Sequence, residues 1–309
     1  MPAGRGPVVV IGDVMTDVVT RVDDPMALGS DTAARICTRQ GGAGANVAAW
    51  VATLGHDVAF VGRVGDDPFG REAVQVLTDG AVRTHVAIDP VVPTGACVVL
   101  VGGDGERTML PDAGANSGLD PAGLPVGLLR TAGHLHVSGY TLLNPGSRAA
   151  GHAALALARA AGVPTSVDAA RAVPLDAVGA KVFSRLTEDV DLLFCTLDEG
   201  EVLCGTRTPA TLAARLTAGY PQVVLKLGPD GATWAADSDE PPVHVPAAPA
   251  AGAAVDSTGA GDAFAAAYLA STCGGGTVER ALVRACALGA LLVTREGTRP
   301  TAADVGLQL

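Results

Sequence analysis

Positive charge is scarce in this sequence of 309 residues. Lysine and arginine together number 21 against 32 acidic residues, and the only lysines are Lys181 and Lys226, so the formal net charge is −11. Because nucleic acids are bound through clustered lysine and arginine side chains, the composition argues against a nucleic-acid partner. The same charge would repel an anionic nucleotide at long range, so we expect any phosphate site to be built from local dipoles and a metal ion.

A long hydrophobic run near the beginning of the sequence is also missing. Residues 1–7 lack the charged and then apolar order of a signal peptide, and the run at 8–11 is too short to span a membrane. We therefore expect a cytoplasmic protein without a membrane partner. The six cysteines include no C-x-x-C pair, which argues against a zinc knuckle or a small disulfide scaffold.

What the sequence does contain is an alternation of short apolar runs with longer Ala-rich stretches. The runs at 8–11, 58–64, 134–138, 165–168, 192–195 and 223–227 indicate strands, and the stretches at 44–55, 69–78, 146–161, 260–273 and 277–293 indicate helices. This alternation predicts an α/β fold with a largely parallel sheet covered by helices on both faces.

Two segments break the alternation, at about 14–40 and about 93–111, the second with a turn at 102–105. We interpret them as β-rich insertions into a single domain of residues 1–309. Placed beside the strand ends where α/β proteins bind ligands, they would form a lid over a substrate crevice.

The most informative segment is 256–264, with the sequence D-S-T-G-A-G-D-A-F, and a helical stretch follows it at once. Without side chains at Gly259 and Gly261, the backbone N–H groups that open the helix can approach a phosphate closely, and the helix dipole favours its charge. Asp262 falls in the first helical turn, where its carboxylate could accept the proton of an attacking hydroxyl. The plainer alternative is a glycine-rich turn in which Asp262 only caps the helix.

This segment resembles the D-T-x-G-A-G-D signature of the ribokinase family, the PfkB-type carbohydrate kinases, with Ser257 in place of the first threonine. The segment 41–46, G-G-A-G-A-N, resembles the G-G-x-x-x-N signature of the same family, and the resemblance extends over nearly the whole chain. It implies a ribokinase-like, Rossmann-type three-layer sandwich with a small β-rich lid. It also implies ATP and Mg²⁺ as co-substrates, transfer of the γ-phosphate to an alcohol, and a homodimer formed through the lid.

The resemblance further implies roles for individual residues. Asp262 is the expected catalytic base, with Gly259, Ala260 and Gly261 as the anion hole. The residues expected to bind the acceptor are Asp13, Asp17, Gly41, Gly42, Asn46, Arg107 and Tyr140. Those expected to bind the nucleotide are Thr196, Lys226, Gly228, Gly231, Thr258, Gly259, Gly261, Cys286 and Gly289. Glu199 is expected to hold Mg²⁺ through water, and Asp256, with the segment 289–297, to hold a monovalent cation such as K⁺.

Several positions depart from the family pattern. The family usually has N-x-x-E at the strand end that organises Mg²⁺, and here Thr196 replaces the asparagine while Glu199 is kept. Cys286 stands where ribokinases carry an asparagine near the adenine. Tyr140 stands where they carry a ribose-binding glutamate, and Ala43 replaces a usual lysine, which argues against ribose as the acceptor.

The sequence therefore predicts an ATP-dependent carbohydrate kinase that acts on a sugar-like acceptor. A nucleoside kinase and a 2-keto-3-deoxy-sugar-acid kinase of the same family are alternatives, although an aromatic content of 3% counts against the stacking surface that a nucleoside needs. A catalytically silent metabolite-binding protein is the alternative outside enzymes. Its usual mark is the loss of the base or of the anion-hole glycines, and both are present here.

Overall fold

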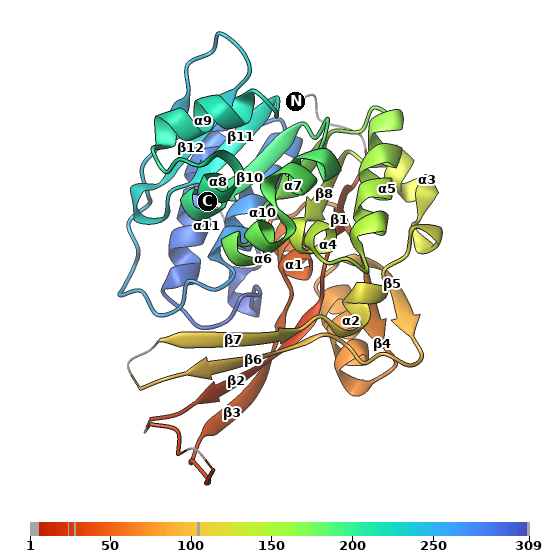
Figure 1. Cartoon of the computed structure of the whole chain (residues 1–309), viewed down its shortest axis with the longest axis vertical. Helices are drawn as coiled ribbons and strands as arrows, with labels where there is room; N and C mark the ends of the chain where they lie inside the picture. The colour runs from red at the N-terminus through yellow and green to blue at the C-terminus, as the bar shows by residue number, and fades with distance from the viewer. Residues whose placement is uncertain (1–5, 24, 28, 104–105, 308–309) are drawn as a thin grey trace.

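A nine-stranded sheet lies at the centre of the computed structural model (Figure 1), which describes residues 6–23, 25–27, 29–103 and 106–307. The strands run in the order β13-β12-β11-β10-β9-β8-β1-β4-β5. From β11 to β5 neighbouring strands are parallel, whereas β12 and β13 add an antiparallel edge. The expected, mainly parallel sheet is confirmed. Its strands are β1 (Val8–Ile11), β4 (Val58–Gly65), β5 (Arg83–Asp89), β8 (His134–Ser138), β9 (Thr165–Asp168), β10 (Leu192–Thr196), β11 (Gln222–Lys226), β12 (Ala232–Ala236) and β13 (Val243–Val245).

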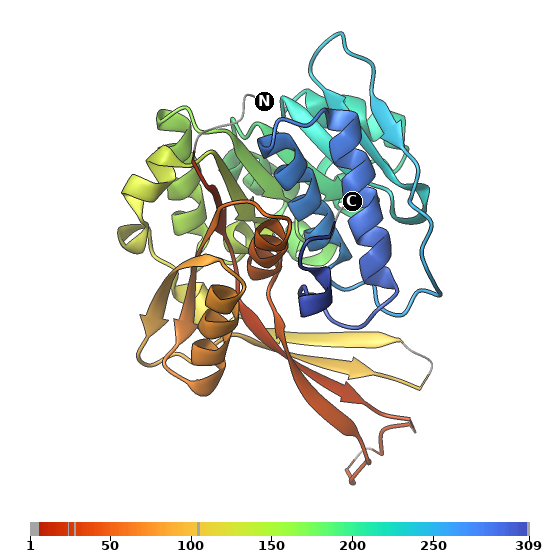
Figure 2. The same ribbon diagram turned by 180° about the vertical axis from the view of Figure 1, so that it is seen from behind.

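Helices cover both faces of this sheet and give the expected three layers (Figures 1 and 2). One face is covered by α1 (Ala43–Thr53), α2 (Pro68–Asp79), α10 (Ala260–Cys273) and α11 (Val278–Val293). The other is covered by α3 (Val126–Thr131), α4 (Gly139–Leu143), α5 (Arg148–Ala160), α6 (Ala172–Val178), α7 (Ala180–Leu186), α8 (Leu197–Cys204) and α9 (Pro209–Thr217). Because side chains alternate along a strand, Val8 and Val10 of β1 pack in the first core, whereas Val9 and Ile11 pack in the second.

A second, smaller sheet projects from the sandwich (Figure 1). Its strands, in the order β3-β2-β6-β7, come from the two segments in which the sequence predicted β-rich insertions. They are β2 (Met15–Arg21), β3 (Arg35–Gly41), β6 (Ala96–Val101) and β7 (Arg107–Asp112). Residues 104 and 105 of the turn expected at 102–105 lie outside the described residues. We call this four-stranded sheet the lid. A buried cluster of Val19, Cys97, Val99 and Val101 packs on one of its faces.

The six strands and five helices expected from the sequence are present, with ends displaced by at most two residues. The sequence analysis missed β5, β12 and β13, together with α3, α4 and the helices from α6 to α9. Short 3-10 helices add η1 (Gly114–Gly118), η2 (Pro121–Gly123), η3 (Gly228–Asp230) and η4 (Ala302–Asp304). Within the described part of the chain, no helix combines the length and the apolar character needed to span a bilayer.

The parallel strands all end along one edge of the large sheet, the edge at which α/β proteins bind ligands. Helix α1 begins directly against the end of β1, because a Cβ atom on Gly44 would lie only 2.5 Å from the Cα of Gly12. Glycine at both positions therefore allows a contact that any side chain would prevent. As a result the first turn of α1, with the G-G-A-G-A-N segment, lies at the ligand-binding edge.

Candidate active site

A cleft of about 840 Å³ lies between the lid and the carboxyl ends of the parallel strands. This volume lies within the range of small-molecule sites. The residues that line the cleft include many of those expected from the sequence: Asp13, Asp17, Gly42, Asn46, Tyr140, Thr196, Glu199, Lys226, Thr258, Gly259, Gly261 and Asp262. The fold thus brings the two sequence signatures together, although Asn46 and Asp262 are 216 positions apart in the chain.

The beginning of α10 has the form expected of an anion hole. Gly259 caps the helix in the left-handed conformation, with φ of 77°, and a Cβ atom there would lie 2.7 Å from the Cβ of Thr298. Gly261 is not left-handed, and the nearest atom to a Cβ added there is Lys226 Nζ, at 3.4 Å. Position 259 therefore requires glycine, because of its left-handed backbone conformation and the nearby Thr298 side chain. Glycine at position 261 instead leaves open space, in which a phosphate can approach the free N–H groups of the first turn.

Asp262 lines the cleft from this same first turn of α10. Asn46 of α1 donates a hydrogen bond from Nδ2 to Asp262 Oδ2, at 2.8 Å. Burial raises the pKa of Asp262 to about 7, although the hydrogen bond from Asn46 acts in the opposite direction. A carboxylate with a pKa near neutrality can both take up and release a proton at physiological pH, which is the property that a general base needs.

Asn46 is held in turn by two residues that the sequence analysis did not identify. Arg299 Nε donates to Asn46 Oδ1 at 2.7 Å, and Thr298 Oγ1 lies 3.1 Å from the same oxygen. Arg299 also donates from Nη2 to the carbonyl of Gly41, at 2.8 Å. Because donors occupy Oδ1, the amide is oriented with Nδ2 toward Asp262.

Asp17 brings a carboxylate from the lid into the cleft. It is 9% exposed, and the structure shows no hydrogen bond to its carboxylate from any of the described residues. Burial raises the pKa of Asp17 to about 6, and the nearby Arg299 acts to lower it. Gly41 leaves room for this carboxylate, since a Cβ there would lie 2.6 Å from Asp17 Oδ2. Two free carboxylate oxygens in a cleft are suited to accepting hydrogen bonds from a polyol.

Asp13 has a different environment, although it also lines the cleft. Its Oδ2 accepts a hydrogen bond from Ala43 N at 3.0 Å, and its Oδ1 accepts from Gly44 N at 3.3 Å and from the Ser138 hydroxyl at 3.3 Å. The carboxylate therefore satisfies free N–H groups at the beginning of α1. Asp13 thus fixes the position of the helix that carries Asn46.

A partly buried ion pair connects the ends of β9 and β11. Lys226 Nζ lies 2.6 Å from Asp168 Oδ2. Burial acts to lower the pKa of Lys226, but the carboxylates of Asp168 and Glu199 outweigh it and raise the pKa, so the ammonium stays charged in the cleft. The sequence analysis identified Lys226 and missed Asp168, a single residue at a strand end with no motif around it.

Glu199 and Thr196 form a capping box at the beginning of α8. Thr196 N donates to Glu199 Oε2 at 2.8 Å, and Glu199 N donates to Thr196 Oγ1 at 3.4 Å. Burial raises the pKa of Glu199, and the ammonium of Lys226 acts to lower it. Together, Asp168 and Glu199 provide carboxylate oxygens beside Lys226. Such oxygens can accept hydrogen bonds from the water ligands of Mg²⁺. Among the described residues, no group of three or more histidine, cysteine, aspartate or glutamate side chains could hold a metal ion directly.

Other residues expected at the site do not line the cleft: Gly41, Arg107, Gly228, Gly231, Asp256, Ala260, Cys286 and Gly289. Gly41 and Ala260 adjoin residues that do. Gly231 shapes the turn after β11, with φ of 90° and a Cβ position 2.1 Å from the carbonyl oxygen of Val245. Cys286 packs in the core beside α10. Arg107 of the lid forms an ion pair with Asp256.

Two arginines that the sequence analysis did not identify also line the cleft. Arg63 is neutralised by Asp89, with Nη2 2.9 Å from Oδ2. The guanidinium of Arg171 donates from Nη2 to Met109 Sδ, at 3.5 Å, and pairs with no carboxylate among the described residues. Tyr140 is the only tyrosine, tryptophan or phenylalanine of the described chain that lines the cleft.

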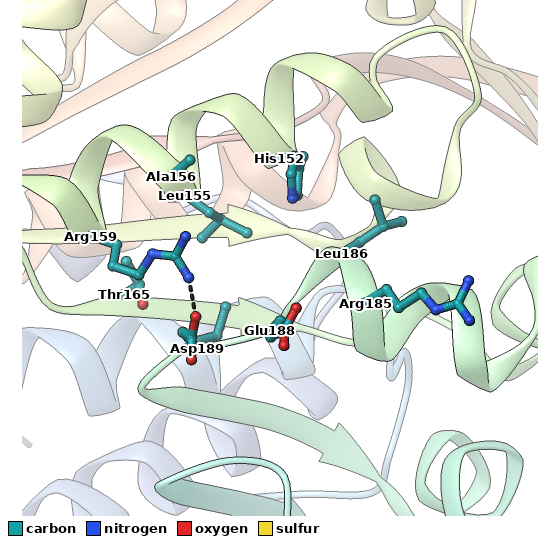
Figure 3. Close-up of a pocket in the computed structure, with 10 residues that line it drawn as sticks. His152, Leu155, Ala156, Arg159, Thr165, Arg185, Leu186, Glu188 and Asp189 are labelled. Atoms are coloured by element: carbon teal, nitrogen blue, oxygen red, sulfur yellow. Dashed lines mark hydrogen bonds and ion pairs between the residues drawn. The ribbon is translucent and has the colours of Figure 1, made fainter.

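A second pocket lies at the opposite edge of the sheet, where β9 and β10 begin (Figure 3). It measures about 60 Å³, far below the volume of small-molecule sites. Arg159 and Asp189, which line it, are already joined in an ion pair. The large cleft is therefore the candidate active site.

Known proteins share both the sequence and the fold of this chain. Residues 6–304 match the family model described as pfkB family carbohydrate kinase. An ATP-dependent ribose-1-phosphate kinase from Halopiger xanaduensis is 34% identical, and the alignment covers 94% of each chain. A fructokinase from Klebsiella pneumoniae is 32% identical, over 95% of each chain. The crystal structure of a putative ribokinase II from E. coli in complex with ATP and Mg²⁺ matches with a TM-score of 0.85 and 26% identity, over 95% of this chain and 94% of that chain.

The hydrogen bond from Asn46 to Asp262 can be tested by titration. In Asn46→Leu the pKa of Asp262 should rise by about one unit above the value of the unsubstituted protein. A hydrogen bond to a charged group contributes about 1.5 kcal/mol or more, and one pKa unit corresponds to about 1.4 kcal/mol. The measurement is a ¹³C NMR titration of the aspartate side-chain carboxyl carbons, in which Asp262→Asn identifies the resonance.

Thr298→Val is the matched control, because it removes a hydroxyl from Asn46 Oδ1 and leaves the donor to Asp262 in place. In this variant the pKa of Asp262 should stay at about 7. An unchanged pKa in Asn46→Leu, or an equal rise in both variants, would contradict the role given to the Asn46 amide.

Proposed function

The chain belongs to the pfkB family of carbohydrate kinases, ATP-dependent phosphotransferases that act on a hydroxyl of a sugar or sugar-like acceptor, and we propose that Asp262 is the base of this reaction. The observation that carries the proposal is that one cleft contains the partly buried carboxylate of Asp262, the beginning of α10 and the free carboxylate of Asp17. In this proposal the N–H groups at Gly259, Ala260 and Gly261 hold the γ-phosphate, and Asp17 holds the acceptor hydroxyls.

The chemistry explains why a base is needed. The acceptor oxygen forms a bond to the γ-phosphorus, the bond from this phosphorus to the bridging oxygen of ADP breaks, and the acceptor releases a proton. A sugar hydroxyl is too weak an acid to lose this proton beforehand at neutral pH, so Asp262 takes it up as the new bond forms. The base must be ionised first, and activity should therefore rise as the pH increases through the Asp262 pKa of about 7.

Groups of the chain also stabilise the transferred phosphoryl group. The first turn of α10 offers N–H donors and the positive end of the helix dipole, and the ammonium of Lys226 adds a full charge. Mg²⁺ bound with ATP would neutralise phosphate oxygens, and in this proposal Glu199 and Asp168, which line the cleft, would hold its water ligands. The presence of ATP and Mg²⁺ in the similar E. coli structure supports both ligands here.

The acceptor in this proposal carries a phosphate or a carboxylate in addition to its hydroxyls. Arg171 supports this, because it is the arginine of the cleft that no carboxylate of the described chain neutralises. A planar guanidinium binds either anion through paired hydrogen bonds. Tyr140 alone provides too little aromatic surface for stacking a nucleobase, which argues against a nucleoside. The name of the ribose-1-phosphate kinase relative is consistent with an anionic acceptor, and that of the fructokinase is not.

An ADP-release assay with neutral sugars, sugar phosphates, sugar acids and nucleosides tests this assignment. We expect the highest kcat/KM for a sugar phosphate or sugar acid. In Arg171→Met the acceptor KM should rise about tenfold or more, while the KM for ATP changes little, because the guanidinium is assigned to the acceptor alone. Arg185→Met, in the small pocket at the opposite edge, is the control and should change neither value.

The outcomes of this assay separate the two levels of the proposal. A neutral sugar or a nucleoside as the best substrate, with no effect of Arg171→Met, would contradict the anionic acceptor but would still support kinase activity. No ADP formation with any acceptor would contradict the kinase itself.

We also propose that two copies of the chain associate through their lids. Ile36, Val98 and Leu110 are 66%, 36% and 55% exposed, and the strand register places them on the face opposite to Asp17 and Cys97. Exposed apolar side chains on a sheet whose outer strands β3 and β7 have free edges form a surface that a second lid can cover.

Replacing this apolar surface tests the association. Ile36→Asp combined with Leu110→Asp should convert a dimer into a monomer, because two buried and unpaired charges would oppose the contact. Light scattering coupled to size-exclusion chromatography gives the mass. A monomeric unsubstituted protein, or a variant that remains a dimer, would contradict a contact through this face.

A further inference from the structure

Arg107 of the lid forms a partly buried ion pair at the base of the anion hole. Its Nη1 contacts Asp256 Oδ1 and lies 3.0 Å from Thr258 Oγ1. The side chains of Arg107 and Asp256 are only 20% and 7% exposed. Asp256 Oδ1 also accepts a hydrogen bond from Thr258 N, at 2.8 Å, one residue before the cap of α10. The guanidinium therefore sits against the segment that orients Gly259.

The resemblance assigns a monovalent cation to this position, with Asp256 and backbone carbonyls of 289–297 as ligands. Three of these carbonyls already accept hydrogen bonds. Leu291 O accepts from Thr294 Oγ1 at 2.8 Å, Leu292 O accepts from Arg295 N at 3.2 Å, and Val293 O accepts from Val255 N at 2.7 Å. The N–H group of Asp256 also points to Val293 O, at 3.2 Å, so a cation there would face hydrogen-bond donors.

The local charge also opposes a second cation. Arg21 and Arg39 of the lid both pair with Glu296, which lies in the same 289–297 segment. Together with Arg107 they place three guanidinium groups beside two carboxylates, those of Glu296 and Asp256. Both carboxylates already have guanidinium partners, and an alkali cation at Asp256 would lie beside the guanidinium of Arg107 and be repelled by it. The residues present therefore do not fit this cation.

We propose that Arg107 supplies the positive charge at Asp256 and that the enzyme consequently works without an alkali cation. This inference rests on the proposed role of the first turn of α10 as the anion hole. Arg107 acts through Asp256 and Thr258 and is a positioning residue. Because β7 belongs to the lid, this ion pair connects the lid to the segment that precedes the anion hole.

The test compares potassium, sodium and choline chlorides at equal ionic strength, in the unsubstituted enzyme and in Arg107→Met. The unsubstituted enzyme should show the same kcat in all three salts, within about twofold. Arg107→Met should lose about tenfold or more of kcat in choline chloride, since the carboxylate of Asp256 is left without its partner. Potassium should restore part of that loss, because the carboxylate of Asp256 has lost its guanidinium partner and can then attract a cation.

Two further variants identify the cause. Arg107→Lys keeps a charge at Asp256 and should stay insensitive to the choice of salt. Arg21→Met removes a different contact between the lid and the 289–297 segment, so any loss of activity it causes should be the same in potassium and choline. A response to potassium in Arg21→Met equal to that of Arg107→Met would indicate a general effect of lid opening and would overturn the proposal.

Thermal unfolding temperatures provide a reading that does not require catalysis. Potassium should raise the unfolding temperature of Arg107→Met relative to choline and leave that of the unsubstituted protein unchanged. Stabilisation of the unsubstituted protein by potassium, or potassium-dependent activity in it, would overturn the inference. If no acceptor yields ADP, the proposed function fails, and the unfolding temperatures still decide this inference.

Discussion

The site depends on one hydrogen bond between two helices, from Asn46 of α1 to Asp262 of α10. The partner of a general base must hold it in place without stabilising its charge so strongly that it no longer takes up a proton. A neutral amide satisfies both demands. Asp89 shows the contrast within the same molecule: two backbone N–H groups and Arg63 hold its pKa at about 2, whereas Asp262, partly buried beside an amide, has a pKa of about 7.

The position of this amide is itself set by the end of the chain. Trp50, one turn beyond Asn46, donates its indole N–H to the carbonyl of Thr298 at 2.9 Å, and Arg299 binds both Asn46 and the carbonyl of Gly41. Because side chains alternate along the strands of the lid, its two faces carry different residues. One face carries Asp17 to the cleft, and the other exposes apolar residues such as Leu110.

The sequence predicted the parts of this site that lie in continuous motifs. The segments around Asn46 and Asp262 need glycine for close backbone contacts, and such contacts leave a readable pattern. Arg299, Asp168 and Arg171 could not be predicted, because each is a single residue that acts only where distant elements meet in the fold. The missed helices α6 and α7 have seven residues each, too few to establish a helical period. Cys286 was expected near the nucleotide, yet it packs in the core.

The most direct test of the account is the turnover of Asp262→Asn, measured together with the dissociation constants of ATP and the acceptor. Asparagine keeps the shape of the side chain and can cap a helix, but it cannot take up the proton. The account predicts that kcat falls by about 10²–10⁴-fold, the usual contribution of a general base, while both dissociation constants change by no more than a few-fold. A kcat within a few-fold of the unsubstituted enzyme would contradict it.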